Sequence, residues 1–456
     1  MNSITNSNPI QMLNNLIEDT TSNIQKYCKN PGKDFIRNRK LPPQKLLKLI
    51  LEMEGNSINA ELFKSFPNIE ERMSASAFVQ QRNKLKPEVF HDMLLKLNKI
   101  SNKKTFKGYQ VVAIDGSSFC FPANPKSECF VKRHQTRKDG EDAKSYCLLH
   151  ANIIYDVLNK QYIDCFAGPK HGIGGNERLW GEKLIDSHIR AKQIVAMDRG
   201  YISYNLIEHG NRSGGYYVLR SPIGRDNSIP EIGALPDEEC DQWFDIPVTP
   251  YQRKKYLNAG YRSLQIVKKG YKSEDDLTED GIKARKKRWD FEEACIVHFR
   301  AIKVKINEEG ENKWEVIITN LPSDQFSAND IKDLYGRRWN IEISFRSLKY
   351  ALGAIQFHSK QDDFVLQELY AHLVMYNIVA ACGNEVELPN RITKHDYAID
   401  FKMAVTIVRS FFKNKILSFQ RLCSELSRYT QAIRPGRKDP RKIRLKSPVY
   451  FIYRVA

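Results

Sequence analysis

Cysteine patterns that bind zinc or form disulfides are missing from this 456-residue sequence. Its nine cysteines include no CxxC pair and no cluster with histidine at zinc-finger spacing, and their number is odd. Such a set is typical of buried, reduced thiols in an intracellular protein. The first residues also lack the charged start and apolar core of a signal peptide. We therefore expect a cytoplasmic protein.

The sequence also has no apolar run that predicts a membrane span. The most apolar predicted helix, near residues 365–381, contains Gln367, Glu368 and His372, so we expect it in the core of the protein. No internal repeat or low-complexity segment stands out. Hydrophobic residues make up 41% of the chain, enough for a substantial core, and the length predicts two to four domains.

Acidic residues are in short supply: 54 Asp and Glu stand against 72 Lys and Arg, a net charge of +18. A surplus of this size favours a polyanionic partner, because each neutralised phosphate releases counterions. A merely soluble basic protein, or one bound to an anionic membrane, is the alternative. Basic runs at 283–288 and 434–446 are predicted to face phosphate, although such runs are more often solvated surface.

The first 105 residues read as helical. A helix is predicted after Pro42-Pro43, a polar one over residues 75–84, and another from Pro87. Short helices with basic and glutamine side chains suit a DNA-reading module. A plain helical bundle explains this stretch almost as well.

The pattern changes to mixed α and β after Gly108. Strands are predicted at residues 109–114, 147–155, 161–166, 193–197 and 215–220, with helices at 177–189 and 205–209. This order describes a mixed α/β sheet. Residues 222–312 read as a β-rich insertion, with separate strands beginning at Cys295 and Ile302. A strand at 314–319 and a long helix from Ala328 follow.

Two aspartates stand directly after short apolar strands, Asp115 after residues 109–114 and Asp198 after residues 193–197. Ligands gather at strand ends in open α/β sheets. Gly200 follows Asp198 and would let the backbone approach a phosphate closely. For either aspartate alone, a turn or helix-capping role explains the position equally well.

The helix from Ala328 carries further candidates. Ser327 and Asp330 form a predicted capping box at its start. Four polar residues fall within an arc of roughly 60° on this helix: Tyr335, Arg338, Glu342 and Lys349. The adjoining stripe is apolar and should face the core: Leu334, Ile341, Phe345 and Leu348. The alternative is a solvated helix side with an Arg338–Glu342 pair contributing about 0.2–0.5 kcal/mol.

The spacing Tyr335-x2-Arg338-x3-Glu342-x6-Lys349 resembles the Y-R-E-K signature of the insertion-sequence-four family of DDE transposases. Asp115-Gly and Asp198-Arg-Gly-Tyr look like the first two acidic motifs of that family. The separations of 83 and 144 residues between the three acids also suit it. The resemblance covers roughly residues 105–385.

The resemblance implies an RNase H-like core in which Asp115, Asp198 and Glu342 are catalytic and bind two Mg²⁺ ions, with Mn²⁺ able to substitute. Two metals about 3.5–4 Å apart can activate a water or 3′-hydroxyl and stabilise the leaving oxygen. It also implies that four residues bind DNA: Tyr335, Arg338, Lys349 and Trp314. Trp314 would stack on a flipped base, although a tryptophan at the start of a strand is more often core.

The expected fold class is therefore α/β, an RNase H-like mixed sheet with a β-rich insertion. We expect a helical DNA-binding region at 1–105, core segments at 106–221 and 313–385 on either side of an insertion at 222–312, and a basic, mainly helical C-terminal region at 386–456.

The expected function is cut-and-paste DNA transposition by a bacterial, nucleoid-associated enzyme. Its partners would be double-stranded DNA, as transposon ends and target, and a second copy of the chain in a synaptic homodimer. Two rivals remain: a catalytically silent DNA-binding descendant, and a host nuclease on the same core. A membrane-bound basic protein is a distant third, because no amphipathic basic helix dominates.

Overall fold

The computed structural model describes residues 8–37, 39–98, 104–132, 145–223, 229–264, 288–308, 311–388, 396–413 and 418–433. It contains two compact units: one comprises residues 1–104, 116–176 and 339–456, and the other residues 105–115 and 177–338. One boundary falls inside strand β1 (Gln110–Pro122), and another follows Arg338. The predicted basic runs at 283–287 and 434–446 lie outside the described residues.

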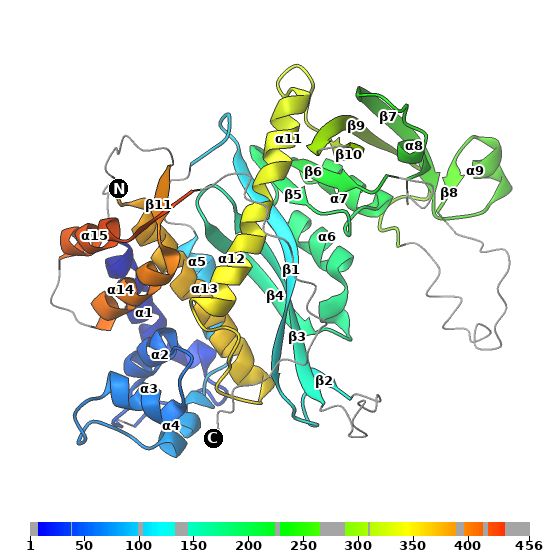
Figure 1. Cartoon of the computed structure of the whole chain (residues 1–456). Coiled ribbons are helices and arrows are strands. Elements are labelled where there is room, and N and C mark those ends of the chain that lie inside the picture. Colours follow the sequence, from blue (N-terminus) through cyan, green and yellow to red (C-terminus); the bar gives the residue numbers. More distant parts are fainter. Residues whose placement is uncertain are drawn as a thin grey trace, which may run out of the picture. The chain divides into compact units, whose positions relative to one another are not determined.

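The first unit is built around a long helix, α13 (Asp362–Asn384), drawn in gold in Figure 1. Its side chains are buried all round, which is typical of a helix in the centre of a core. Within the described part of the chain, α13 is long and apolar enough to cross a membrane, but 89% of its most apolar window is buried. The prediction of a core helix is therefore confirmed.

Helices from the N-terminal part of the chain pack around α13. Of these, α1, α2 and α5 contact it directly. α2 begins at Pro43, as predicted, because proline is preorganised for the first helical position. The N-terminal elements are α1 (Pro9–Ser22), η1 (Ile24–Tyr27), α2 (Pro43–Glu52), α3 (Ile58–Ser65), α4 (Ala75–Arg82) and α5 (Glu88–Leu97).

The first unit also contains an antiparallel sheet. β3 (Tyr146–Asp156) pairs with β4 (Gln161–Pro169) and β2 (Phe130–Val131), and it lies beside the second half of β1. The remaining elements of this unit are η2 (Ile173–Gly175), α12 (Trp339–Tyr350), β11 (Tyr397–Ile399), α14 (Phe401–Lys413), α15 (Phe419–Arg428) and β12 (Thr430–Ala432).

The second unit is a mixed sheet with helices packed on it. The first half of β1 runs parallel to β5 (Gln193–Met197), and β5 runs parallel to β6 (Tyr216–Ser221). Val111–Ile114 and Ile194–Met197 are fully buried, as expected for parallel strands covered on both faces. The sheet continues antiparallel through β10 (Glu311–Thr319), β9 (Cys295–Glu308) and β7 (Cys240–Thr249), and ends at β8 (Arg262–Ser263).

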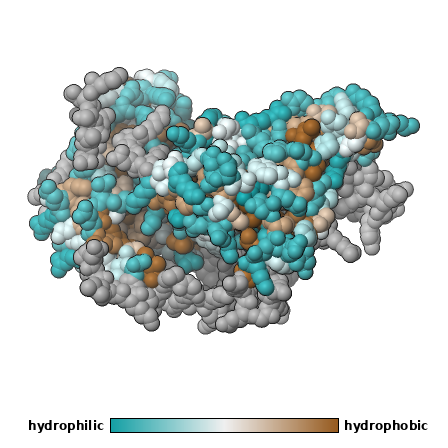
Figure 2. Space-filling view, turned by 90° about the horizontal axis from the view of Figure 1, so that it is seen from above, coloured by the Kyte–Doolittle hydropathy of each residue, from teal (hydrophilic) through white to brown (hydrophobic). Residues whose placement is uncertain are grey.

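Helices α7 (Tyr204–Arg212) and α11 (Ala328–Arg337) contact this sheet, and α6 (Glu177–His188) contacts α7. Two short helices, α8 (Pro230–Gly233) and α9 (Lys254–Asn258), complete the unit. In Figure 2, hydrophilic residues cover most of the visible face, and hydrophobic residues form small separate patches. Apolar side chains are therefore gathered mainly in the interiors of the units.

Three predicted elements differ from the structure. β1 does not end before Asp115 but continues to Pro122, because Ser117, Phe119 and Phe121 alternate into the core and extend the period-two pattern. The two strands predicted from Cys295 and Ile302 form one strand, β9. The long helix from Ala328 is divided into α11 and α12 at Arg338, whose N–H bonds the carbonyl of Tyr335, a tighter turn than the α-helical one.

Candidate active site

Asp115 and Asp198 stand at the end of the pairing between two neighbouring parallel strands of the second unit. The pairing of β1 with β5 runs from Gln110↔Gln193 to Ala113↔Ala196. Two residues further along, the same register would set Asp115 opposite Asp198, the residue directly after β5. Adjacent strands lie about 4.8 Å apart, and side chains at matching positions point to the same face. Two carboxylates so close repel each other and favour a cation between them.

Arg338 supplies one such cation. Its Nη1 lies 3.5 Å from Oδ2 of Asp115, and its side chain is only 4% exposed. The guanidinium also lies 5.6 Å from the ring centroid of Tyr335, which is buried. Burial raises the pKa of the Tyr335 phenol, although Arg338 and Arg220 oppose the shift. Both residues are thus buried beside the acids and not on an exposed helix rim.

The turn after Asp198 holds its carboxylate in place. The N–H of Gly200 donates to Oδ1 of Asp198 at 2.8 Å, and Nε of Arg178 donates to the carbonyl of Gly200 at 2.8 Å. A Cβ on Gly200 would lie 3.0 Å from Oδ1 of Asp198. The glycine therefore permits the close approach of the backbone to this carboxylate.

Tyr201 lies beneath the two aspartates, with its side chain 1% exposed. Burial raises the pKa of its phenol well above the ordinary value, and the charges of Asp115, Glu177 and Asp198 raise it further. Among the described residues, its hydroxyl has no hydrogen-bond partner. A buried donor without a partner costs about 1–3 kcal/mol, so this hydroxyl is suited to bind a metal-bound water or an acid.

Glu342 and Lys349 belong to α12 in the first unit. Glu342 is in the first turn of the helix, where the helix dipole favours a carboxylate. Nζ of Lys349 lies 4.9 Å from the ring centroid of Phe119. Burial lowers the pKa of Lys349, so a bound anion would stabilise its charged form. The apolar stripe predicted beside them is buried, as expected: Leu334, Ile341, Phe345 and Leu348.

Trp314 is half-buried on β10. Nζ of Lys303 lies 4.8 Å from its ring centroid, so one face of the indole is already in contact with a cation. A second stacking partner would have to approach the other face. The position of Trp314 opposite Lys305 in the ladder makes it part of a sheet surface.

A second group with metal-ligand geometry lies elsewhere in this unit. Ligand atoms of Glu182, His209 and Asp290 are within 4.8 Å of one another. Arg288 neutralises both carboxylates, with nitrogens 2.9 Å from Glu182 and 2.8 Å from Asp290. Because a guanidinium already provides the positive charge, this cluster is a structural network that ties residues 288–290 to α6 and α7.

The prediction from the sequence did not include two contacts of Asp115 and Asp198. It did not anticipate that Arg338 pairs with Asp115, because 223 residues separate them. It also gave no role to Tyr201, although this residue closes the Asp198-Arg-Gly-Tyr motif. In the second unit, Arg338 contacts Asp115, and the register of β1 with β5 relates Asp115 to Asp198.

A family model described as "Transposase DDE domain" matches residues 106–378, a span that contains Asp115, Asp198 and Glu342. The chain is 21% identical over 392 residues to the transposase InsG for insertion sequence element IS4 of Escherichia coli (strain K12). That match covers 82% of this chain and 76% of the relative.

Two further similarities are more distant. The transposase for insertion sequence element IS231B of Bacillus thuringiensis subsp. berliner is 22% identical over 212 residues, which is 43% of this chain and 41% of that protein. A solved structure of the piggyBac transposase synaptic complex with hairpin DNA aligns at a TM-score of 0.43 and 10% identity. This alignment covers 95% of this chain and 87% of that one.

Proposed function

Because the chain belongs to the DDE transposases of the insertion-sequence-four type, we propose that it moves its own element by cut-and-paste transposition. In this proposal the helical region at 1–105 binds the terminal inverted repeats, and two copies of the chain synapse two ends in the cytoplasm, on nucleoid DNA. Metal-dependent hydrolysis frees each end, and strand transfer joins it to target DNA. The matched register of Asp115 and Asp198 carries the proposal.

The proposed metal site consists of Asp115, Asp198 and Glu342. Their hard carboxylate oxygens suit Mg²⁺, which prefers oxygen ligands. Glu342 follows Arg338 by four residues, so chain length limits the distance between their Cα atoms to about 14 Å. Two ions bound there would activate a water or 3′-hydroxyl and stabilise the leaving oxygen.

The protein's own groups would prepare this site before metal binds. Arg338 neutralises Asp115 before DNA binds, and its guanidinium can then grip the incoming phosphate with two hydrogen bonds. The Tyr201 hydroxyl donates to a water or carboxylate oxygen between the acids. Gly200 and Arg178 fix the turn that aims Asp198.

Four residues would hold the transposon end: Tyr335, Arg338, Lys349 and Trp314. The Lys349 ammonium acts as a point charge beside a phosphate. The phosphate in turn stabilises the protonated form of Lys349, which burial disfavours. Trp314 offers only its free ring face to a flipped base, because Lys303 occupies the other. A hairpin pathway therefore depends on access to that one face.

The proposed core is RNase H-like. β1 lies between β3 and the parallel strand β5 in the strand order, which supports such a core. The proposed limits are 106–221 and 313–385 for the core and 222–312 for the β-rich insertion. The C-terminal region would cover 386–456.

A cleavage assay tests this function. Labelled DNA carrying the element's own ends is incubated with the protein and Mg²⁺, comparing wild type with Asp198→Asn and with Asp324→Asn, an exposed aspartate of the same unit. We expect cuts at the ends that depend on metal, are lost in Asp198→Asn and persist in Asp324→Asn. If the protein binds the ends but does not cut them, it is a catalytically silent descendant of a transposase. If it cuts the ends but does not join them to target DNA, it is a host nuclease.

A further inference from the structure

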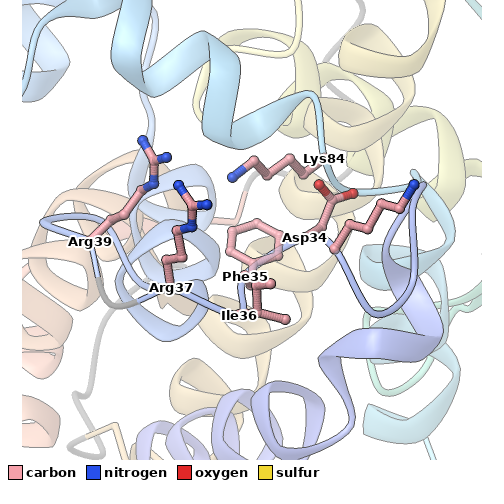
Figure 3. A pocket seen from close by; sticks show the side chains of 7 residues that line it. Asp34, Phe35, Ile36, Arg37, Arg39 and Lys84 are labelled. Carbon is pink, nitrogen blue, oxygen red and sulfur yellow. The ribbon is translucent and has the colours of Figure 1, made fainter.

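A pocket of about 340 Å³ lies in the first unit, beside the loop that follows η1. Its walls include Asp34, Phe35, Ile36 and four cationic side chains: Lys33, Arg37, Arg39 and Lys84. In Figure 3, Arg37, Arg39 and Lys84 extend toward one another on one side of the Phe35 ring, and the Asp34 carboxylate lies on the other side. The lining carries four positive charges against one negative charge.

The four cations are not neutralised by acids. Within the described parts of the chain, none of them forms an ion pair. The one lining carboxylate is already engaged, because Oδ2 of Asp34 accepts the backbone N–H of Asn30 at 3.0 Å. Four cations gathered around a single carboxylate leave an excess of positive charge in the pocket, and an anion relieves the repulsion among them.

The loop that forms the pocket is held rigidly. The side chain of Gln25 accepts the N–H of Gly32 at 2.8 Å and donates to the carbonyl of Asp34 at 2.8 Å. The N–H of Lys29 bonds the carbonyl of Lys84 at 2.8 Å, which ties the loop to the segment after α4. The backbone around Asp34 and the segment that carries Lys84 are thus bonded together, so binding need not bring these two segments together.

Phe35 forms the floor of the pocket at a conformational cost. Its φ is 58°, in the left-handed region that a bulky residue adopts only with strain of about 1–3 kcal/mol. Nζ of Lys84 lies 5.2 Å from the centroid of its ring. The strained backbone turns an aromatic surface toward the same space that the cations face, a combination that fits a sugar-phosphate chain.

We propose that this pocket binds the sugar-phosphate backbone of duplex DNA, at a point separate from the carboxylate site. Arg37 and Arg39 grip one phosphate, Lys84 neutralises its neighbour, and the Phe35 ring packs against the intervening deoxyribose. The site would help to position the protein on the DNA backbone and would not distinguish base sequences, because phosphate contacts carry no sequence information. The identification of the ligand as DNA rests on the proposed function; the anion site itself rests on the pocket.

The salt dependence of DNA binding tests this proposal. Affinity of the full chain for a labelled duplex carrying the element's end is measured by fluorescence anisotropy over a range of salt concentrations. The test variant is Arg37→Gln/Arg39→Gln. The control variant is Lys26→Gln/Lys96→Gln, which removes the same charge from the same unit at two exposed lysines already paired with acids.

Each lost phosphate contact lowers the slope of log affinity against log salt by about 0.9. Because Arg37 and Arg39 grip one phosphate between them, the test variant should lose about 0.9 in slope, and the control should keep the wild-type slope. Equal slopes in the test variant and wild type, or equal losses in test and control, would overturn the proposal. An unchanged melting temperature for both exposed-residue variants shows that folding is intact.

Cleavage by the same preparations separates this inference from the proposed function. End cleavage with an unchanged salt slope rejects the pocket and keeps the transposase. A reduced slope without any metal-dependent cleavage keeps the pocket and rejects the transposase. If the wild-type chain binds no DNA at all, both proposals are wrong.

Discussion

The buried ion pair between Arg82 and Glu368 leads to a quantitative prediction. Both side chains are at most 1% exposed, and Nη1 of Arg82 lies 2.8 Å from Oε1 of Glu368. Arg82 also donates to Gln367 at 2.8 Å. Because Arg82 ends α4 and Glu368 belongs to α13, this pair fastens the N-terminal helices to the core helix of the first unit.

The magnitude follows from what remains after one partner is removed. Burial raises the pKa of Glu368, but His358 and Arg82 together hold it well below its usual range. In Arg82→Met, Glu368 keeps only the His358 contact, whose Nδ1 is 3.0 Å away. Breaking a buried pair costs about 3–5 kcal/mol. Because the hydrogen bonds from His358 remain, we expect a loss near the lower end, about 3 kcal/mol.

Urea unfolding followed by circular dichroism measures this loss. The control is Lys26→Met, which removes a cation that is 69% exposed in its pair with Asp92; such pairs contribute at most about 1 kcal/mol. The double variant Arg82→Met/Glu368→Gln should recover part of the stability, since no buried charge is then left unpaired. Equal losses in Arg82→Met and Lys26→Met would refute the reasoning.

Two further predictions concern packing and pH. A Cβ at Gly181 would lie 2.8 Å from the buried Tyr201 ring, whereas Gly336 has no atom within 4 Å of its Cβ position. Gly181→Ala should therefore lower the free energy of unfolding by about 1–3 kcal/mol and reduce DNA cleavage, whereas Gly336→Ala should change neither. Thermal melts and the cleavage assay measure both effects. Equal effects of the two substitutions would contradict the packing argument. Burial, with Arg409 nearby, lowers the pKa of His372 to about 4. The unfolded chain protonates this residue near pH 6.5, so stability should fall by about 3 kcal/mol between pH 6.5 and 4. Urea titrations should show that His372→Gln loses less stability than the wild type between pH 6.5 and 4. If both proteins show the same dependence of stability on pH, another group is responsible.

The sequence by itself was sufficient for features that are encoded within a short segment. The capping box of Ser327 and Asp330 is present as predicted, because it depends on residues three apart. The high apolar content of residues 365–381, interrupted by polar residues, predicted the core helix α13, and the stretch at 193–197 predicted β5 with Asp198 directly after it. The family itself was visible in local spacing, since the signature from Tyr335 to Lys349 lies within one helical stretch.

Tertiary structure decided which distant groups meet. The register of β1 against β5, which matches Asp115 with Asp198, depends on pairing between strands 83 residues apart. No local pattern specifies such a register. The contact of Arg338 with Asp115 depends on the turn at Arg338 that divides α11 from α12.

The same holds for the basic pocket. Arg37 and Arg39 are ordinary charged residues in the sequence, and Lys84 follows them by more than forty positions. The backbone bond from Lys29 to Lys84 brings the two segments together. The sequence determined which chemical groups the protein carries and which short elements hold them. Folding alone determined which charges are neutralised and which remain for a ligand, because that depends on contacts between residues far apart in the chain.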